Sequence, residues 1–238
     1  MKLDFILSQW HAWAPGLDSR DDRLLAAHNM GAPGRVFKAL QRRLTPLAKA
    51  VFNVAEPCIE DDEIMPVVFS SAQGEICKSL EMLKTIQAGE ELSPTAFSLS
   101  VHNAIAGLFS IAYRNHQEIT VIAPGQEGIA PAFIEALGML NEGADEVLMI
   151  LYDEPIADFY PIAPFNLDTP FPCVLALRLS LSGVGQPFQF GCCAESRDDG
   201  EHPVQLLTFL RFLLNDAQVL SLGNQGHSWT WHKQSSAS

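Results

Sequence analysis

The sequence predicts an α/β fold in which helices cover both faces of a mixed β-sheet. Short apolar runs alternate with segments whose apolar residues recur at helical spacing, a pattern typical of layered α/β proteins. Two of these runs, residues 119–123 and 146–152, are apolar on both faces and therefore need cover on both sides of the sheet. Of the 238 residues, 47% are hydrophobic, which is enough for a sizeable core.

The first predicted elements lie between residues 35 and 86. In the basic stretch 35–49, Thr45 followed by Pro46 has the form of a helix N-cap with proline in the first turn, which predicts two short helices. Residues 66–70 (PVVFS) are an apolar run and predict a buried strand. Residues 74–86 carry apolar side chains at helical spacing and predict a helix.

The middle of the chain continues the alternation. Residues 94–97 are expected to form an extended link. Residues 100–114 are apolar on most faces and predict a buried helix. The runs 119–123 and 146–152 predict strands, and residues 128–140 between them predict a helix.

The last third begins with residues 153–171, which are rich in Pro and Asp and predict a loop. Residues 174–181 and 188–192 predict two antiparallel strands joined around a glycine-rich turn. Residues 203–220 predict a helix, and residues 229–231 predict an edge strand. The sheet is therefore expected to be mixed.

We expect residues 1–238 to form one domain, in which the segment after about residue 160 supplies strands and a C-terminal capping helix. The formal net charge of −13 argues against a nucleic-acid partner, because phosphate binding needs a positive field. No apolar run approaches the 18–20 residues of a membrane span.

The expected compartment is the cytoplasm. The first apolar stretch is interrupted by Asp4 and ends at Gln9, which is unlike a signal peptide. The five cysteines are an odd number in a chain of this length, so we expect buried free thiols rather than a disulfide framework.

Two groups of residues are candidates for a catalytic or ligand site. Ser70 and Ser71 lie between a strand and a helix, as a hydrolase nucleophile would, but no G-x-S-x-G motif surrounds them. A polar cluster at residues 192–202 matches no zinc spacing and is interpreted as a solvated loop. Because glycine-rich phosphate motifs are also absent, we expect no metal and no cofactor.

Residues 93–126, SPTAFSLSVHNAIAGLFSIAYRNHQEITVIAPGQ, carry the most specific signal. They resemble the β-ketoacyl synthases of the thiolase fold, in which a Ser-Pro-x-x-Phe link leads into a buried helix with an N-x-x-x-G pattern. Asn103 and Gly107 supply that pattern here. Residues 130–153 and the Arg42-Arg43 pair also resemble tracts of the family. The resemblance spans nearly the whole chain, but only as the N-terminal half of a ketosynthase.

The resemblance places Gln126 where the family carries its cysteine nucleophile. A cysteine at that turn would be activated by a helix N-terminus, whereas an amide is not a nucleophile. The family's two histidines come from the missing half, and nothing here resembles their loops. Gln126-Glu127-Gly128 is similar to the Q-x-G of chain length factors in type II polyketide systems. Half-length versions of chain length factors occur in aryl polyene pathways. Residues 10–16 (WHAWAPG) also resemble these half-length proteins.

This resemblance implies a subunit of a β-ketoacyl-[acyl carrier protein] synthase complex that does not condense acyl units alone. It would form a heterodimer with a full-length ketosynthase through the strand at residues 119–123, and shape the tunnel for a growing polyene chain. Gln73, Gly74 and Cys77 are candidate wall residues, with ordinary packing as the alternative for Cys77. Gly74 and Cys77 are three positions apart, so they should share a helix face.

Two further expectations follow. The basic stretch 35–49 is a candidate contact for an acidic acyl carrier protein, or else a solvated helix face. The competing class of function is an independent small acyl-binding module or hydrolase that reuses half of the fold.

Overall fold

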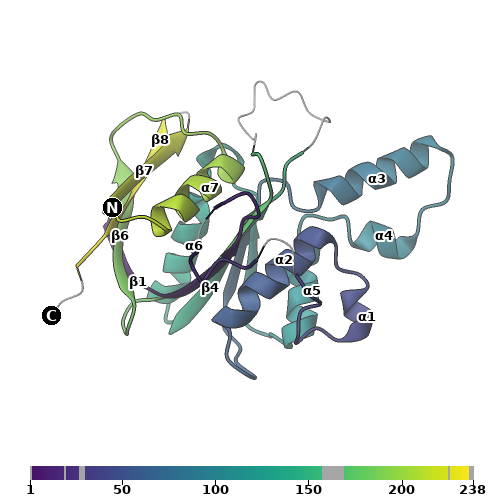
Figure 1. The fold of residues 1–238 in the computed structure, drawn as a ribbon, viewed down its shortest axis with the longest axis horizontal. Coiled ribbons are helices and arrows are strands. Elements are labelled where there is room, and N and C mark those ends of the chain that lie inside the picture. Colours follow the sequence, from purple (N-terminus) through teal and green to yellow (C-terminus); the bar gives the residue numbers. More distant parts are fainter. Residues whose placement is uncertain (1, 19, 27–29, 157–168, 225, 236–238) are drawn as a thin grey trace.

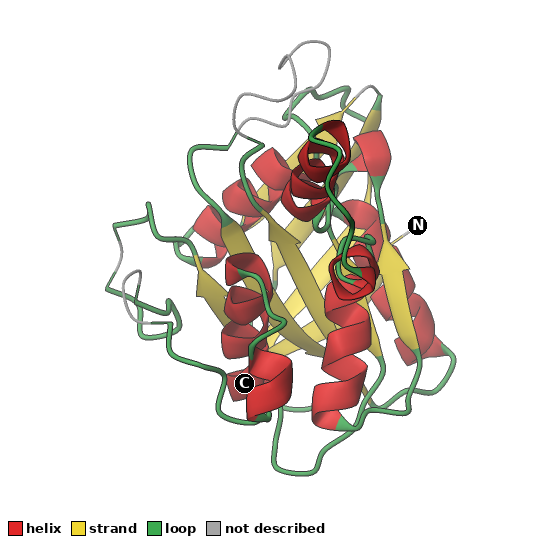
Figure 2. Cartoon of the chain, turned by 90° about the vertical axis from the view of Figure 1, so that its right-hand side faces the viewer, coloured by secondary structure: helices red, strands yellow, loops and turns green. Residues whose placement is uncertain are grey.

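The computed structural model describes residues 2–18, 20–26, 30–156, 169–224 and 226–235. Within these residues the chain forms one eight-stranded mixed sheet with helices on both faces, as predicted (Figures 1 and 2). The strands are β1 (Lys2–Trp13), β2 (Val67–Ser70), β3 (Ile119–Ile122), β4 (Glu146–Asp153), β5 (Cys173–Ser180), β6 (Gln186–Cys193), β7 (Val219–Asn224) and β8 (His227–Lys233). The helices are α1 (Lys38–Gln41), α2 (Pro46–Ala55), α3 (Ile76–Gln87), α4 (Pro94–Ser98), α5 (Ala104–Tyr113), α6 (Ala130–Asn141) and α7 (His202–Leu213), with 3-10 turns η1 (Glu56–Cys58) and η2 (Gly125–Glu127).

The sheet has the strand order β3-β2-β4-β5-β1-β6-β8-β7. Strand β2 lies parallel to both β3 and β4, whereas every other neighbouring pair is antiparallel. Because β2, β3 and β4 run in one direction, their carboxyl ends meet at the same edge of the sheet, which is where α/β proteins place their sites.

Two hydrophobic clusters cover the two faces of the sheet. One contains buried side chains of α6 and α7, with Phe133 and Phe209 packed edge to face at 5.2 Å. The other contains buried side chains of α2 and α5, with Phe52 and Phe109 at 5.8 Å. Strand β4 alternates between the two clusters along its length, and from Val147 onward every residue is buried. The prediction of cover on both sides is confirmed for β4.

The start of α2 is as the sequence predicts. The Thr45 hydroxyl accepts a hydrogen bond from the Ala48 amide at 3.0 Å, and Pro46 occupies the first helical position. Two short helices, α1 and α2, therefore replace what could have been one, because Pro46 cannot continue a preceding helix.

Strand β1 was not predicted, and it changes the topology of the last third. It lies between β5 and β6, so the prediction of a direct antiparallel pair at residues 174–181 and 188–192 is wrong. The register of β1 against β5 shifts between Leu7 and Gln9. This irregularity breaks the alternation that would identify a strand from the sequence.

One predicted element type and one predicted helix end are also wrong. The expected extended link at residues 94–97 is helix α4, whose N-cap Ser93 accepts from the Ala96 amide at 3.4 Å. The helix expected to reach residue 220 ends at Leu213, and the remaining residues turn into β7. Ser93 followed by Pro94 is the same start signal as at α2, and it overrides the expectation of an extended link.

Helix α7 does not cap the helix that the sequence suggested. It was expected to cover the predicted helix at residues 100–114, but α7 packs with α6, on the sheet face opposite α5. Strand β3 likewise is only half-buried rather than fully covered. Most of the predicted loop at residues 153–171 lies outside the described residues.

Helices α3 and α4 form an arm that projects from the body of the molecule (Figure 1). Neither helix has a buried residue, and Leu83, Ile86 and Phe97 are more than half exposed. Among the described helices, none is long and apolar enough to cross a membrane.

Candidate functional site

The carboxyl edge of β2, β3 and β4 gathers three of the residues singled out from the sequence. Gln73 and Gly74 lie in the turn after β2, and Gln126 lies in η2 after β3. Cys77 lies one turn further along, in α3. Asn103 is the N-cap of α5 and Gly107 lies in the first half of that helix, and His102, which precedes Asn103, contacts the turn after β2.

Gln126 is exposed, in a 3-10 turn that leads into α6. Gly125 and Gly128 flank it with φ of +56° and +66°, a conformation that side chains rarely adopt. A Cβ at Gly128 would also collide with the side chain of Gln205, which accepts a 3.4 Å hydrogen bond from the Ile129 amide. The turn is therefore tightly built, but its exposed side chain is an amide.

A buried hydrogen-bond array lies under the same edge, and the sequence did not predict it. The Nδ1 atom of His202 lies 2.6 Å from Oδ2 of Asp153, and its Nε2 lies 3.1 Å from the Ser70 hydroxyl. These are the residues and distances of a Ser-His-Asp catalytic triad. The members come from β2, β4 and the start of α7, so no local motif could have revealed them.

The surroundings of this array differ from those of a hydrolase site. Ser70 and His202 are fully buried, so the hydroxyl is not open to a substrate. The amides of the following turn are already bonded: Ala72 and Gln73 donate to Asp153, and Gly74 donates to the Ser71 hydroxyl. A hydrolase would need such amides free to stabilise an oxyanion.

Gly74 does not begin the helix, contrary to the prediction that it shares a helix face with Cys77. It precedes α3 with φ of +54°, and a Cβ there would lie 2.9 Å from the side chain of His102. His102 in turn places Nε2 2.8 Å from the Ser71 carbonyl oxygen. Gly74 is therefore required by the turn, and it does not simply leave room for a chain.

Cys77 lines a cavity of about 630 Å³ between the start of α2 and the α3–α4 arm. The hydroxyl of Thr45 donates a 2.8 Å hydrogen bond to Glu75 on its wall. Burial raises the pKa of Glu75 to about 7, and burial, followed by a hydrogen bond to Glu154, raises the pKa of Cys77 to about 12. Near neutral pH the thiol is thus protonated and is a poor nucleophile.

Asn103 and Gly107 line a shallower groove of about 390 Å³ along α5 and the free side of β3. A Cβ at Gly107 would meet nothing within 4 Å, and Ile111, one turn further along α5, is 58% exposed. In the described residues, β3 pairs with β2 alone, so its other side offers unpaired backbone groups. Such an edge favours pairing with another chain.

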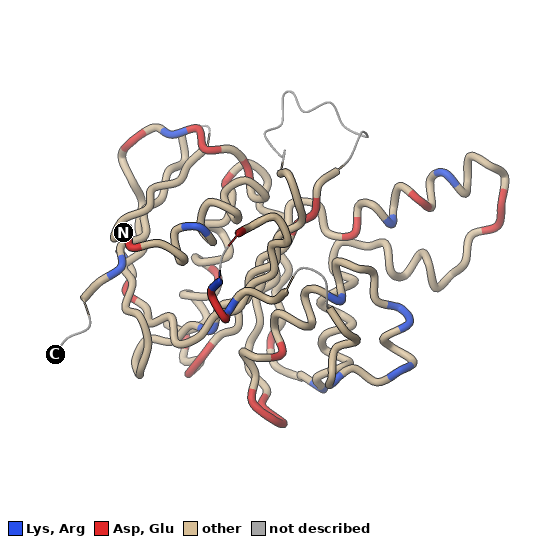
Figure 3. The backbone as a smooth tube through the Cα atoms, in the orientation of Figure 1, with Lys and Arg blue, Asp and Glu red and all other residues tan. Residues whose placement is uncertain are grey.

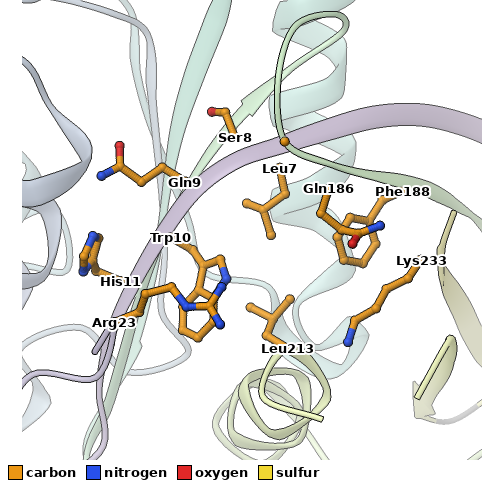
Figure 4. A pocket seen from close by; sticks show the side chains of 11 residues that line it. Leu7, Ser8, Gln9, Trp10, His11, Arg23, Gln186, Phe188, Leu213 and Lys233 are labelled. Carbon is orange, nitrogen blue, oxygen red and sulfur yellow. The ribbon is translucent and has the colours of Figure 1, made fainter. Parts of the chain in front are cut away.

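A third hollow lies beside β1 and holds none of the residues predicted from the sequence (Figure 4). The Arg23 guanidinium lies 4.0 Å above the Trp10 ring and is hydrogen-bonded to Asp21. Lys233 donates to the Phe212 and Asn215 carbonyl oxygens at the end of α7. Both cations are thus engaged in holding the fold.

Comparison with known proteins identifies the architecture. The family model for the β-ketoacyl synthase N-terminal domain matches residues 10–232. None of the curated proteins matches the chain.

Solved structures of similar fold include ketosynthase complexes. One matching chain belongs to the complex of the ketosynthase ApeO with its chain length factor ApeC from Xenorhabdus doucetiae. The match has a TM-score of 0.78 and 22% identity, and covers 97% of this chain and 100% of that one. The ishigamide ketosynthase/chain length factor matches with a TM-score of 0.53 and 13% identity, covering 79% of this chain and 56% of that one. A chain of AntDE:AntF, the complex of a type II polyketide acyl-carrier protein with its ketosynthase, matches with a TM-score of 0.58 and 10% identity. This match covers 98% of this chain and 100% of that one. These likenesses show a shared thiolase-like fold.

Proposed function

Because the chain belongs to the β-ketoacyl synthase family through its N-terminal domain, we propose that it is a non-catalytic subunit of the chain-length-factor type. It pairs with a full-length ketosynthase in a cytoplasmic heterodimer and shapes the acyl tunnel. The pathway is of the type II polyketide or fatty-acid kind, and specifically makes aryl polyenes.

The observation that carries this proposal is the exposed Gln126, which follows the edge strand β3. Gln126 lies in the turn between β3 and α6. The resemblance of residues 93–126 to the family assigns to this turn the cysteine of a condensing member. A carboxamide can neither accept an acyl group as a thioester nor be activated by the helix that follows. Catalysis must then come from another subunit.

The partner surface is proposed to combine the free side of β3 with the exposed face of α5. The groove along this surface includes Gly107, and Ile111 lies beside it. A strand of the ketosynthase would continue the sheet beyond β3, and apolar side chains would cover Ile111. A stable interface of this kind buries on the order of 800 Å² on each partner.

The tunnel wall is proposed to include the turn at Gln73 and Gly74 and the first turn of α3, with Cys77. This position is supported by the closeness of the turn to Gln126 at the carboxyl edge of the sheet. The exposed apolar residues of the arm would then be covered by the ketosynthase, since their exposure to water is unfavourable.

An acidic acyl carrier protein is the proposed second partner. Lysines and arginines gather along α1, α2 and the segment that links them (Figure 3). Arg42 and Arg43 are exposed and line the cavity beside the arm. In a chain of net charge −13, this positive patch favours an acidic partner.

The test is a condensation assay with a ketosynthase encoded beside this chain, an acyl carrier protein and malonyl units. We expect no turnover by this chain alone, and carrier-bound β-ketoacyl products with release of CO₂ from the pair. Steady turnover by the purified chain, free of any ketosynthase, would contradict the proposal and favour an independent enzyme.

A further inference from the structure

The carboxylate of Asp153 receives four hydrogen bonds, although it is almost completely buried. Its Oδ1 accepts from the Ser71 hydroxyl at 2.7 Å and from the Gln73 amide at 3.2 Å. Its Oδ2 accepts from His202 Nδ1 at 2.6 Å and from the Ala72 amide at 3.2 Å. A buried carboxylate with this many donors is a fixed anchor, because losing any partner leaves a polar group unsatisfied.

His202 extends the anchor to a third element. When the neutral ring carries its proton on Nδ1 and donates to Asp153, its Nε2 can only accept, here from the Ser70 hydroxyl. Ser70 ends β2, Asp153 ends β4 and His202 begins α7. The array therefore joins the C-terminal part of the chain to the turn between β2 and α3.

Further hydrogen bonds and one close contact set the direction of that turn. Gly74 donates to the Ser71 hydroxyl at 2.7 Å, and His102 packs against Gly74 and lies 2.8 Å from the Ser71 carbonyl oxygen. The arm that follows has no buried residue in α3. The orientation of the arm therefore depends on this turn, together with the hydrogen bonds from Thr45 to Glu75 and from Ser79 to the Ser100 carbonyl oxygen.

We propose that Asp153 is a positioning residue that fixes the turn at residues 71–74, and that His202 makes this positioning depend on α7. The array thus fixes the orientation of this turn and of the α3–α4 arm that follows it, and it does not activate Ser70. Gln73 and Gly74 belong to the proposed tunnel wall, so a change in the turn is expected to change the length of the product. This consequence for product length rests on the proposed function.

Hydrogen–deuterium exchange at single-residue resolution tests the positioning directly, on the complex or on the full chain alone. In Asp153→Asn, one carboxylate oxygen becomes an amide nitrogen, so we expect exchange at Ala72 or Gln73 to accelerate about tenfold. Asp145→Asn, at an exposed residue that immediately precedes β4, is the matched control and should change the exchange of neither amide. A folded Asp153→Asn variant with unchanged exchange at both amides would overturn the proposal.

Two substitutions of His202 test the link to α7 and remain informative if Asp153→Asn does not fold. An asparagine places its amide nitrogen where Nδ1 lies and can still donate to Asp153, whereas a glutamine reaches only toward Ser70. We expect His202→Asn to keep the exchange of Ala72 close to the native rate and His202→Gln to accelerate it. Equal rates in the two variants would overturn the role of His202.

A second readout separates this inference from the proposed function. In the complex, Asp153→Asn should broaden the distribution of product lengths while assembly persists. If exchange accelerates but product lengths stay unchanged, the positioning stands and the assignment of Gln73 and Gly74 to the tunnel wall fails.

Discussion

The hydroxyl of Thr45, the N-cap of α2, donates a 2.8 Å hydrogen bond to the carboxyl group of Glu75, which immediately precedes α3. This bond joins two helices that frame the cavity beside Cys77. Glu75 is only 3% exposed, and its burial outweighs the bond from Thr45, so its pKa rises from 4.5 to about 7. The cavity therefore contains a carboxyl group that changes charge near neutral pH.

Glu75 is expected to make stability fall as pH rises from about 4.5 to 7. In this window the folded chain keeps the proton that the unfolded chain releases, so each step up in pH favours unfolding. Over this pH window, the free energy of unfolding should fall by about 3 kcal/mol. Glu75→Gln keeps an acceptor for Thr45 and should remove this slope in thermal unfolding measured between pH 5 and pH 8. Glu90→Gln, on the exposed end of the arm, is the control and should leave the slope in place.

Restoring a cysteine at the nucleophile turn should not restore condensation. Gln126→Cys supplies a thiol, but the two histidines at this edge are already engaged: His202 is buried and bonded to Asp153 and Ser70, and His102 is bonded to the Ser71 carbonyl oxygen. We expect no decarboxylation of malonyl units and no acyl transfer by the variant alone, measured by mass spectrometry of the carrier-bound products. Turnover by the variant without a ketosynthase would show that the chain holds a complete active site.

Enlarging Cys77 should shorten the products. Its side chain lines the cavity beside α3 and is partly exposed, so Cys77→Phe can fill that space without backbone strain. We expect shorter acyl products from the complex, with Cys77→Ser as the control of similar size. Gly74 is unsuitable for this test, because its positive φ and its contact with His102 make any side chain there disruptive. An unchanged length distribution from an intact complex would remove Cys77 from the tunnel wall.

Ser70 should not react with a serine-directed fluorophosphonate. Its hydroxyl is buried and hydrogen-bonded to His202, and the nearby amides are occupied. Intact-mass analysis of the native protein should therefore show no adduct. An adduct that forms on the native chain and on Ser71→Ala, but is lost in Ser70→Ala, would instead favour the hydrolase alternative.

The sequence was most informative where a signal is local. Thr45 with Pro46 predicted the start of α2, and the apolar run at 146–152 predicted the buried strand β4. It failed where long-range pairing decides the outcome. Strand β1 is recognisable only once β5 and β6 are placed on either side of it.

The candidate site divides in the same way. The position of Gln126 could be predicted because the segment before it is continuous in sequence. The array of Ser70, Asp153 and His202 could not, because 82 residues lie between the first two and α7 brings in the third. The conformation of Gly74 was hidden for another reason: a positive φ becomes evident only when His102 is packed against the turn.

The central claim is that this chain pairs with a ketosynthase through the free side of β3, and native mass spectrometry of the co-expressed proteins tests it most directly. We expect a one-to-one complex for the native chain and for Val219→Lys, which lies on β7 at the opposite edge of the sheet. Val121→Lys, on β3, should abolish the complex while the chain stays folded. A native chain that remains a stable monomer beside the ketosynthase, or a Val121→Lys variant that assembles as well as the native chain, would contradict the account.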